Sequence, residues 1–467
     1  MNQRNLSSQA KDLSATKSGQ RTSVSDAQVR EVKSFPAIDV IDNGALFSLS
    51  LRNHTHGLTH GIHRFAAKYI PQVPRWAIRE FASDGDTVLD PFMGSGTTLV
   101  EGLQRCVTTI GVDIDPLARI VASAKTCVIP PDRIEHLAAQ IRRRWTRAAG
   151  ELQLPMSGIK NFAHWFTEPT WRDLQGLFQC IETLHCSDEE RRLLFVLFSS
   201  ILRWVSNADD QSQKTYVSGT RPKTPAPVEE TFWRSVARAK KGMYELEGAV
   251  ARSAGAVVLD DGDARKLPLD DCSVDLVVTS PPYLDSVDYM YNFMLEYFWL
   301  GRLFGISSRE EFNQWRRKGI GTKSPGGMQK PLPASVADLV DTDEVNPQRL
   351  PAVVAYCNGM REHFQEAARV LKPNARYVLV IGNSQTASGI LPVHDALVRF
   401  AAEFQLQIEK AFAYRIRRHY MKFPRKGRGG IILVDWVIVL RKKAKPVSFP
   451  ARLPLPWLTL GADDVAH

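Results

Sequence analysis

The sequence Thr-Ser-Pro-Pro-Tyr (279–283) directly follows the apolar run Val-Asp-Leu-Val-Val (274–278). Each proline lacks the backbone N–H that a β-ladder requires, so a buried strand over 274–278 must end here. The rigid proline pair leaves backbone carbonyl oxygens without strand partners, and the serine adds a hydroxyl. Fixed acceptors at a strand end suit a substrate that brings N–H donors, such as an aromatic amine. Tyr283 adds a ring on which a base can stack.

The lone pair of an aromatic amine is delocalised into its ring, which makes the nitrogen a poor nucleophile. Acceptors on the two amine hydrogens would draw the nitrogen towards tetrahedral geometry as it attacks an electrophile. Residues 280–283 therefore predict a site that activates an exocyclic amine. The alternative is a proline pair that terminates an edge strand and has no chemical role.

A second group of candidate residues lies in the loop Leu-Asp-Pro-Phe-Met-Gly-Ser-Gly (89–96), between an expected strand and an expected helix. Gly94 and Gly96 allow close approaches that a Cβ would forbid, so a ligand can rest against the loop and the helix N-terminus. The loop matches neither GxGxxG nor a P-loop, and phosphate binding is not predicted. Asp113 ends the next strand about 20 residues further on, where an acid can accept both hydroxyls of an adenosine ribose. The combination predicts an adenosine-containing cofactor; the alternative is a tight turn with an unrelated acid.

Asp263 lies just past a third expected strand, in Ala-Val-Val-Leu-Asp-Asp-Gly-Asp-Ala (256–264). Because the carboxyl ends of parallel strands meet at one edge of a sheet, we expect Asp263, the glycine loop and residues 280–283 at the same edge. Asp263 could accept a hydrogen bond from an adenine amino group. It could equally be an acid that caps a turn.

The segments Asp-Pro-Phe-Met-Gly-Ser-Gly-Thr-Thr (90–98), Gly-Val-Asp-Ile-Asp-Pro (111–116) and Thr-Ser-Pro-Pro-Tyr resemble the amino-methyltransferases of DNA. Those enzymes transfer a methyl group from S-adenosylmethionine to an exocyclic base nitrogen. Residues 63–78 resemble a further segment of that family, which folds over the cofactor. The close matches cover about 63–126 and 256–283, agreement is weaker through 353–440, and the insertions are not covered.

This resemblance implies S-adenosylmethionine as the cofactor and no metal. Its methionine moiety would lie by the glycine loop, its ribose on Asp113 and its adenine by Asp263. The cofactor-binding candidates are Asp90, Pro91, Phe92, Gly94, Gly96, Thr97, Asp113, Asp263 and Ala264. The catalytic candidates, which would hold the target base, are Ser280, Pro281, Pro282 and Tyr283.

In the family, a tetrapeptide that begins with Ser occurs mainly in cytosine-N4 enzymes, and Asp or Asn mainly in adenine-N6 enzymes. Ser280 therefore favours direct methyl transfer to N4 of a flipped-out cytosine. Adenine-N6 methylation, RNA guanine-N2 methylation and a non-catalytic DNA-binding protein are the alternatives. Cytosine-C5 chemistry is disfavoured because it needs a nucleophilic cysteine, usually after proline, and no cysteine of this chain follows a proline. The tetrapeptide follows the glycine loop here, whereas most cytosine-N4 enzymes have the reverse, circularly permuted order.

Strand, loop and helix signals alternate from 86 to 126 and resume after 250, which predicts an α/β fold. We expect a Rossmann-like doubly wound methyltransferase sheet, mostly parallel, with an antiparallel strand pair at 407–416 and 431–440, plus a helical insertion. The expected parts are a disordered tail (1–35), the first part of the methyltransferase domain (36–129), the helical insertion (130–250), the second part (251–445, with a polar insertion at about 300–350) and a C-terminal tail (446–467). The helical insertion could read the target sequence or merely support the sheet.

The net charge of +10 and the pI of about 9.3 suit a phosphate-rich partner, although many enzymes also carry a basic face. Six scattered cysteines indicate a reducing compartment, and no apolar run approaches membrane-spanning length. We therefore expect a cytoplasmic protein without a membrane span, and the family resemblance implies a prokaryotic protein that acts on double-stranded DNA. A cognate restriction endonuclease would be a partner, and the oligomeric state is not predicted.

Basic and aromatic residues alternate over 414–430, which suits phosphate contacts and base stacking. The alternative is a basic hairpin loop. The nucleic-acid-binding candidates are Arg415, Arg417, Arg418, Tyr420, Lys422, Arg425 and Arg428. The run Arg-Arg-Lys-Gly-Ile-Gly-Thr-Lys-Ser-Pro-Gly-Gly (316–327) is a second candidate for entering a groove. Four histidines, His54, His56, His60 and His63, are expected on a turn-rich surface rather than on a metal.

Overall fold

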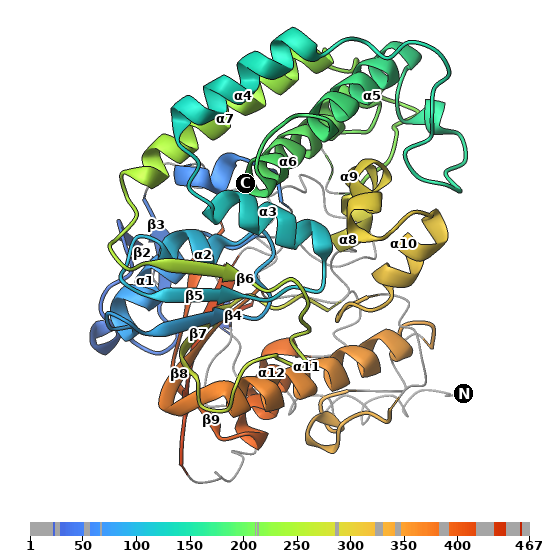
Figure 1. Cartoon of the computed structure of the whole chain (residues 1–467). Coiled ribbons are helices and arrows are strands. Elements are labelled where there is room, and N and C mark those ends of the chain that lie inside the picture. The colour runs from blue at the N-terminus through green and yellow to red at the C-terminus, as the bar shows by residue number, and fades with distance from the viewer. Residues whose placement is uncertain are drawn as a thin grey trace, which may run out of the picture.

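A nine-stranded sheet forms the centre of the protein (Figure 1). The computed structural model describes residues 22–23, 29–50, 57–65, 68–210, 212, 214–284, 289–322, 330–340, 347–382, 392–416, 434–444 and 458–459. The sheet has the order β2-β3-β9-β10-β8-β7-β4-β5-β6. Its strands are β2 (Val29–Val32), β3 (Leu46–Leu49), β4 (Thr87–Asp90), β5 (Thr108–Gly111), β6 (Gly255–Val258), β7 (Val274–Thr279), β8 (Leu371–Gly382), β9 (Leu406–Arg415) and β10 (Val434–Lys442). A separate two-stranded pair joins β1 (Thr22–Ser23) to β11 (Leu458–Thr459).

All neighbouring strands of the large sheet are parallel except at β10, which runs antiparallel to both β8 and β9. This confirms the predicted fold class, including the antiparallel pair near the C-terminus. β4 pairs with β5 on one side and with β7 on the other, although β7 comes much later in the chain. The strand order therefore changes direction between β4 and β7, and ligands of open α/β sheets bind at such a point.

Apolar side chains on both faces explain why the central strands are buried. In β7, Leu276 and Val278 lie in a cluster with helix α1, whereas Val277 lies in a cluster with α11 and α12. Successive side chains of a strand point to opposite faces, so a strand covered on both faces needs an almost continuous apolar run.

The helices are α1 (Gln72–Phe81), α2 (Thr97–Gly102), α3 (Pro116–Thr126), α4 (Pro131–Arg144), α5 (Glu168–Glu182), α6 (Asp188–Val205), α7 (Val228–Glu247), α8 (Tyr289–Asn292), α9 (Met294–Leu300), α10 (Arg309–Arg316), α11 (Leu350–Val370) and α12 (Val393–Glu403).

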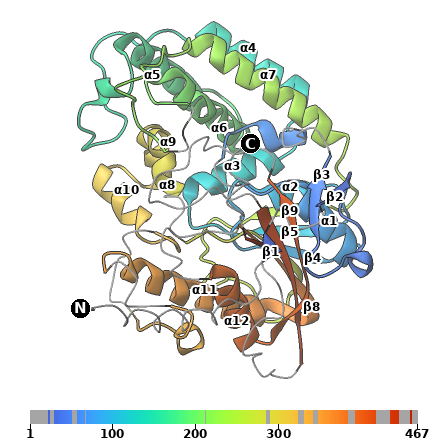
Figure 2. The same ribbon diagram turned by 180° about the vertical axis from the view of Figure 1, so that it is seen from behind.

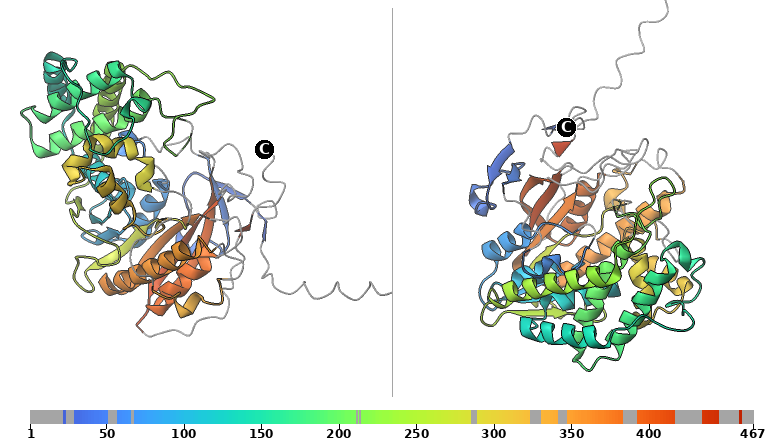
Figure 3. Two further views of the ribbon diagram at one scale, coloured as in Figure 1. Left: turned by 90° about the vertical axis from the view of Figure 1, so that its right-hand side faces the viewer. Right: turned by 90° about the horizontal axis from the view of Figure 1, so that it is seen from above.

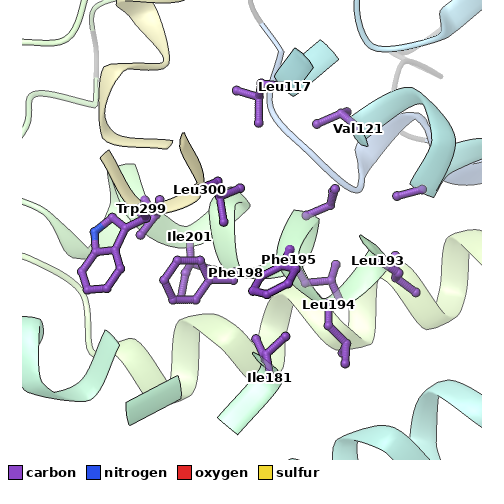
Figure 4. Close-up of a cluster of buried hydrophobic side chains, with 14 of the residues drawn as sticks. Leu117, Val121, Ile181, Leu193, Leu194, Phe195, Phe198, Ile201, Trp299 and Leu300 are labelled. Carbon is purple, nitrogen blue, oxygen red and sulfur yellow. The ribbon is translucent and has the colours of Figure 1, made fainter. Parts of the chain in front are cut away.

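The helices of 130–250 form a layer of their own. Helices α4 to α7 lie over α3, on the side of the molecule opposite to α11 and α12 (Figures 2 and 3). Figure 4 shows Leu117 and Val121 of α3 in one buried cluster with Phe195 and Phe198 of α6 and with Trp299 of α9. Both insertions therefore share an apolar core with the helix that follows β5. The exact domain boundaries stay a prediction.

The expected N-terminal tail overlaps ordered structure. Val29–Val32 of the 1–35 segment forms β2, which pairs in parallel with β3. Residues 1–21 and 24–28 lie outside the described residues, as does 446–467 apart from β11. No helix in the described part of the chain is both long enough and apolar enough to cross a membrane.

One hydrogen bond attaches the second insertion to the helix that follows β5. Tyr297 of α9 is fully buried, and its hydroxyl donates to Oδ1 of Asp115 at 2.5 Å. The same oxygen accepts from the backbone N–H groups of Leu117 and Ala118, so Asp115 is the N-cap of α3.

We expect Tyr297→Phe to lower the free energy of unfolding by about 1–3 kcal/mol, because the buried Asp115 carboxyl loses a hydroxyl donor. Tyr244→Phe is the matched control, since Tyr244 is 71% exposed, and it should change stability by less than about 0.5 kcal/mol. Urea denaturation of both variants measures the difference. Equal stabilities would show that the bond between α9 and α3 contributes nothing.

Candidate active site

A buried carboxylate joins the strand ends at the switch point. Asp90, the last residue of β4, is fully buried and accepts hydrogen bonds from Thr279 Oγ1 at 2.6 Å and from the Phe92 N–H at 3.2 Å. The hydroxyls of Thr98 and of Tyr69 also donate to it, the latter at 3.4 Å. Burial raises the pKa of Asp90 to about 6, although these hydrogen bonds act to lower it. Asp90 thereby connects β4, β7, α2 and the segment before α1.

The glycine loop has the backbone conformation that its sequence suggests. Gly94 and Gly96 have φ values of +48° and +77°. A Cβ on Gly96 would lie 3.0 Å from Cβ of Ala122 on α3, and a Cβ on Gly94 would lie 3.4 Å from the ring of Phe65. Side chains at these positions would therefore fill the space between the loop and its neighbours.

The acid after β5 lies directly against this loop. Asp113 Oδ2 accepts from the Gly94 N–H at 2.9 Å, and Oδ1 accepts from the Asp115 N–H at 2.9 Å. Burial, together with the charge of Asp115, raises the pKa of Asp113 to about 7. Each carboxylate oxygen keeps a lone pair for a further donor, so the site fits a ligand that brings hydroxyl groups.

Asp263 is engaged by its neighbour in sequence. The Arg265 guanidinium binds both of its carboxylate oxygens, with Nη2–Oδ2 at 2.6 Å and Nε–Oδ1 at 2.9 Å. Burial acts to raise the pKa of Asp263, but the bonds with Arg265 outweigh it and leave this pKa below its usual value. Arg265 also donates to the carbonyl oxygen of Lys318 at 3.0 Å. Asp263 therefore lies where the second insertion meets the sheet.

Ala264 and Phe92 meet at a buried histidine. Nδ1 of His363 on α11 lies 3.1 Å from the carbonyl oxygen of Ala264, and Nε2 lies 2.7 Å from the hydroxyl of Tyr377. The Phe92 ring packs edge-on against His363 with 4.7 Å between centroids. His363 of α11 therefore contacts both the loop after β4, through Phe92, and the loop after β6, through Ala264. Pro91 and Thr97 are buried within the same loop and first helical turn.

Residues 280–283 continue from the strand end that Asp90 holds. Ser280 and Pro282 are partly buried, and Pro281 is buried. The Tyr283 hydroxyl donates to Oδ1 of Asp435 on β10 at 3.2 Å. The described structure thus brings the three predicted groups to one sheet edge, as the strand order requires.

Asp435 is a functional candidate that sequence reasoning missed. It is buried in β10, where Oδ2 also accepts from the Tyr414 hydroxyl at 2.8 Å. Burial raises the pKa of Asp435 to about 6, against the hydrogen bonds from the two tyrosines. Its signal was a single acid within the apolar run Val-Asp-Trp-Val-Ile-Val-Leu (434–440), because a lone buried carboxylate needs a partner.

Tyr69, Thr98 and Thr279 were also missed. Each bears a hydroxyl that donates to Asp90, and each was part of a segment that the sequence analysis had noticed for another reason. Their hydrogen bonds join different elements, and the bond of Thr279 joins residues 189 apart in the chain, so no fixed spacing marks them.

The prediction that the four histidines lie on the surface is wrong for His60 and His63, the two that the structure describes. His60 and His63 are each 2% exposed. His60 Nε2 lies 2.7 Å from Oε1 of the buried Glu101, which also binds Arg75. Burial lowers the pKa of His63 to about 3. The short helix Leu58–Gly61, which contains His60, contacts α2, α3 and α7, and the His63 ring lies 6.1 Å from that of Phe293. His54 and His56 lie outside the described residues.

The predicted nucleic-acid-binding stretch is described only at its start. Arg415 is the exposed last residue of β9. Tyr414, counted among the stacking aromatics, is instead buried on Asp435. The remaining candidates, Arg417, Arg418, Tyr420, Lys422, Arg425 and Arg428, lie outside the described residues.

Sheet order, glycine loop and the acid after β5 define an S-adenosylmethionine-dependent methyltransferase. The left-handed glycines leave room for a ligand, and Asp113 offers acceptors for ribose hydroxyls.

Comparisons with known proteins agree with this class. The family model described as DNA methylase, of the N6/N4 type, matches residues 20–122. The type II methyltransferase M.MvaI of Kocuria varians is 26% identical over 80% of this chain and 86% of its own length. M.BsoBI of Geobacillus stearothermophilus is 23% identical over 82% and 86%. These matches identify the chain as a DNA amino-methyltransferase of the N6/N4 type, with S-adenosylmethionine as its methyl donor.

Among solved structures, an S-adenosylmethionine-dependent methyltransferase from Methanosarcina mazei aligns with 79% of this chain and 97% of its own. The sequences are 11% identical and the TM-score is 0.29. So distant an alignment carries no argument about function.

Gly96→Ala should destabilise the protein more than Gly85→Ala does. Both glycines have positive φ, at +77° and +87°, but a Cβ at Gly85 would meet nothing within 4 Å. We expect a cost of about 1–2 kcal/mol at Gly85 from backbone strain and about 1–3 kcal/mol more at Gly96 from contact with Ala122. Urea denaturation measures both. Equal losses would mean that the close approach of α3 does not require glycine.

Proposed function

We propose that the protein is a site-specific DNA methyltransferase that transfers a methyl group from S-adenosylmethionine to N4 of cytosine. The observation that carries this proposal is the hydrogen bond from Thr279 to Asp90. It fixes Ser280, the next residue, beside the loop whose glycine is bonded to Asp113. The proposed amine acceptor, after β7, and the proposed nucleoside acceptor, after β5, would thus lie on either side of the loop that follows β4. The serine that begins the tetrapeptide supports cytosine over adenine.

The methionine moiety of the cofactor would lie against Asp90, Phe92 and the two loop glycines. Asp113 would accept from the ribose hydroxyls, and Asp263 with Ala264 would lie at the adenine. S-adenosylmethionine supplies a methyl group bonded to a positively charged sulfur. The protein chain would orient the cofactor and the target base relative to each other and would exclude water from the site.

Ser280 and the carbonyl oxygens of the proline pair would accept the amine hydrogens of a flipped-out cytosine. This interaction strengthens as the nitrogen gains positive charge, so it favours the transition state over the ground state. The Tyr283 ring would stack on the base, with its orientation fixed by Asp435. The amine loses one proton in the reaction, and the same acceptors are placed to hold it as it leaves.

The relatives are named type II methyltransferases, and the proposal therefore extends to their biological setting. A restriction endonuclease of the same recognition sequence would be its partner in a prokaryotic cytoplasm. DNA from cells that express the protein would then resist that nuclease.

The product decides between the candidate reactions. We expect N4-methylcytosine in a nucleoside digest of duplex DNA incubated with the protein and S-adenosylmethionine, separated by mass spectrometry. Tyr283→Ala, which removes the stacking ring, controls for contaminating methylases and should lower the yield by at least about tenfold. N6-methyladenine would assign adenine instead, and methylated guanine in RNA alone would assign the RNA reaction. A digest without any methylated base would refute the proposal.

Binding of S-adenosylmethionine should tighten as pH rises through about 7. Ribose hydroxyls donate to the ionised Asp113 carboxylate, and its raised pKa of about 7 leaves only about one tenth ionised at pH 6. The dissociation constant should therefore be about tenfold higher at pH 6 than at pH 8.

Isothermal titration calorimetry at both pH values tests this dependence. Asp113→Asn keeps the shape of the side chain without its titration, and should bind more weakly with little change between the two pH values. A wild-type constant that does not change with pH would contradict the assigned role of Asp113.

A further inference from the structure

We propose that the two insertions together form a surface that binds the phosphate backbone of duplex DNA beside the base site. This inference rests on the proposed function and assigns where its DNA substrate lies. The surface, here called the insertion surface, combines cations and aromatic rings. Its members are Lys214, Tyr291, Trp315, Arg316, Arg317 and Lys318.

The two insertions meet although they are far apart in the sequence. Thr215, in the loop between α6 and α7, is buried and donates from Oγ1 to the carbonyl oxygen of Asn292 at the end of α8, at 2.7 Å. Nη1 of Arg203 donates to the same hydroxyl at 3.3 Å. A loop of the helical insertion is therefore fixed to the segment that follows residues 280–283.

The place where they meet adjoins the glycine loop. Phe293 stacks on Phe65 with 4.6 Å between ring centroids, and Phe65 is the side chain that faces Gly94. Tyr291 is two residues before Phe293. In Figure 1, α8 and α10 lie beyond the carboxyl ends of the strands β4, β5 and β6.

The other end of the insertion surface adjoins the tetrapeptide. The Lys318 carbonyl accepts from Arg265, the partner of Asp263. A Cβ on Gly321 would lie 3.4 Å from the carbonyl oxygen of Tyr283. The chain after α10 therefore passes directly over residues 282–283.

Aromatic rings hold the cations of this surface in place. The Arg316 guanidinium lies 4.9 Å and the Lys214 ammonium 6.0 Å from the centre of the Tyr291 ring. The Lys318 ammonium lies 3.9 Å from that of Trp315. Such contacts orient a basic side chain without neutralising its charge.

Three of these cations remain available for a phosphate. Lys214, Arg317 and Lys318 are exposed, and within the described ranges no carboxylate pairs with them. The acids of α10, Glu310 and Glu311, are in its first turn, and Glu311 binds Ser307 and Ser308 there. Arg316 is the last residue of α10 and Arg317 is its C-cap, where the helix dipole also favours positive charge.

Duplex DNA is the partner that fits this arrangement. It carries one negative charge per about 1.7 Å along its axis, and phosphate contacts fix the register of a protein on the duplex. An enzyme that flips a base must hold the phosphates that flank the flipped nucleotide. Arg317 and Lys318 lie just before Gly321, which contacts Tyr283, and would supply such contacts.

Charge reversal tests the insertion surface. The test variant is Arg317→Glu with Lys318→Glu. The matched control is Arg143→Glu with Arg144→Glu, the same change at two exposed arginines of α4, which lies along the outer edge of the helical insertion (Figure 1). Fluorescence anisotropy with a labelled duplex, over a series of salt concentrations, measures DNA affinity. Thermal unfolding and titration with S-adenosylmethionine check that both variants are folded.

We expect the test variant to bind DNA at least about tenfold more weakly than the control. The slope of the logarithm of the binding constant against the logarithm of the salt concentration should fall in magnitude by about one for each lost phosphate contact. Arg317→Ala with Lys318→Ala should show a smaller loss in the same direction. Equal affinities of test and control variants, with wild-type methylation of DNA intact, would overturn this inference and leave the proposed function standing. A wild-type protein that binds S-adenosylmethionine but neither binds nor methylates DNA would overturn both.

Discussion

The active site of this protein depends on one buried carboxylate. Asp90 has no exposed surface, and an isolated charge or polar group there would be costly. Donors therefore converge on it from β7, from α2 and from the segment before α1. The strand order of the sheet changes direction between the neighbouring strands β4 and β7. The hydrogen bond from Thr279 to Asp90 joins the ends of these two strands and so fixes the distance between the loops that follow them.

The same principle recurs at the outer parts of the site. Asp115 is satisfied by the N-terminus of α3 and by Tyr297 of the second insertion. Asp435 is satisfied by Tyr283 and Tyr414. In each case at least one donor to the buried acid comes from a segment distant in the sequence. Because a buried carboxylate without donors is costly, these hydrogen bonds favour the packing that brings the segments together. The insertions are thereby attached to the sheet at the edge where DNA would approach.

Much of the fold could be predicted because its signals are local. Thr87–Asp90 and Thr108–Gly111 are short stretches rich in β-branched residues, each followed by a helix with an evident start, and Pro281 and Pro282 must end β7. Asp435 could not be assigned a role in this way, nor could Tyr69, because their partners are far away in sequence. The histidines at 60 and 63 were predicted on the surface because turn-rich polar sequence usually lies there, whereas tertiary contacts bury both side chains.

The sequence alone determined the chemistry: a glycine loop, an acid after the next strand and a Ser-Pro-Pro-Tyr tetrapeptide are each defined by adjacent residues, whose backbone freedom and donor groups do not depend on distant contacts. Tertiary structure alone decided which hydrogen bonds hold these parts together and where the insertions lie. A local pattern fixes what a residue can donate or accept. Only packing, which removes water from Asp90, Asp115 and Asp435, determines which partner each of them must find.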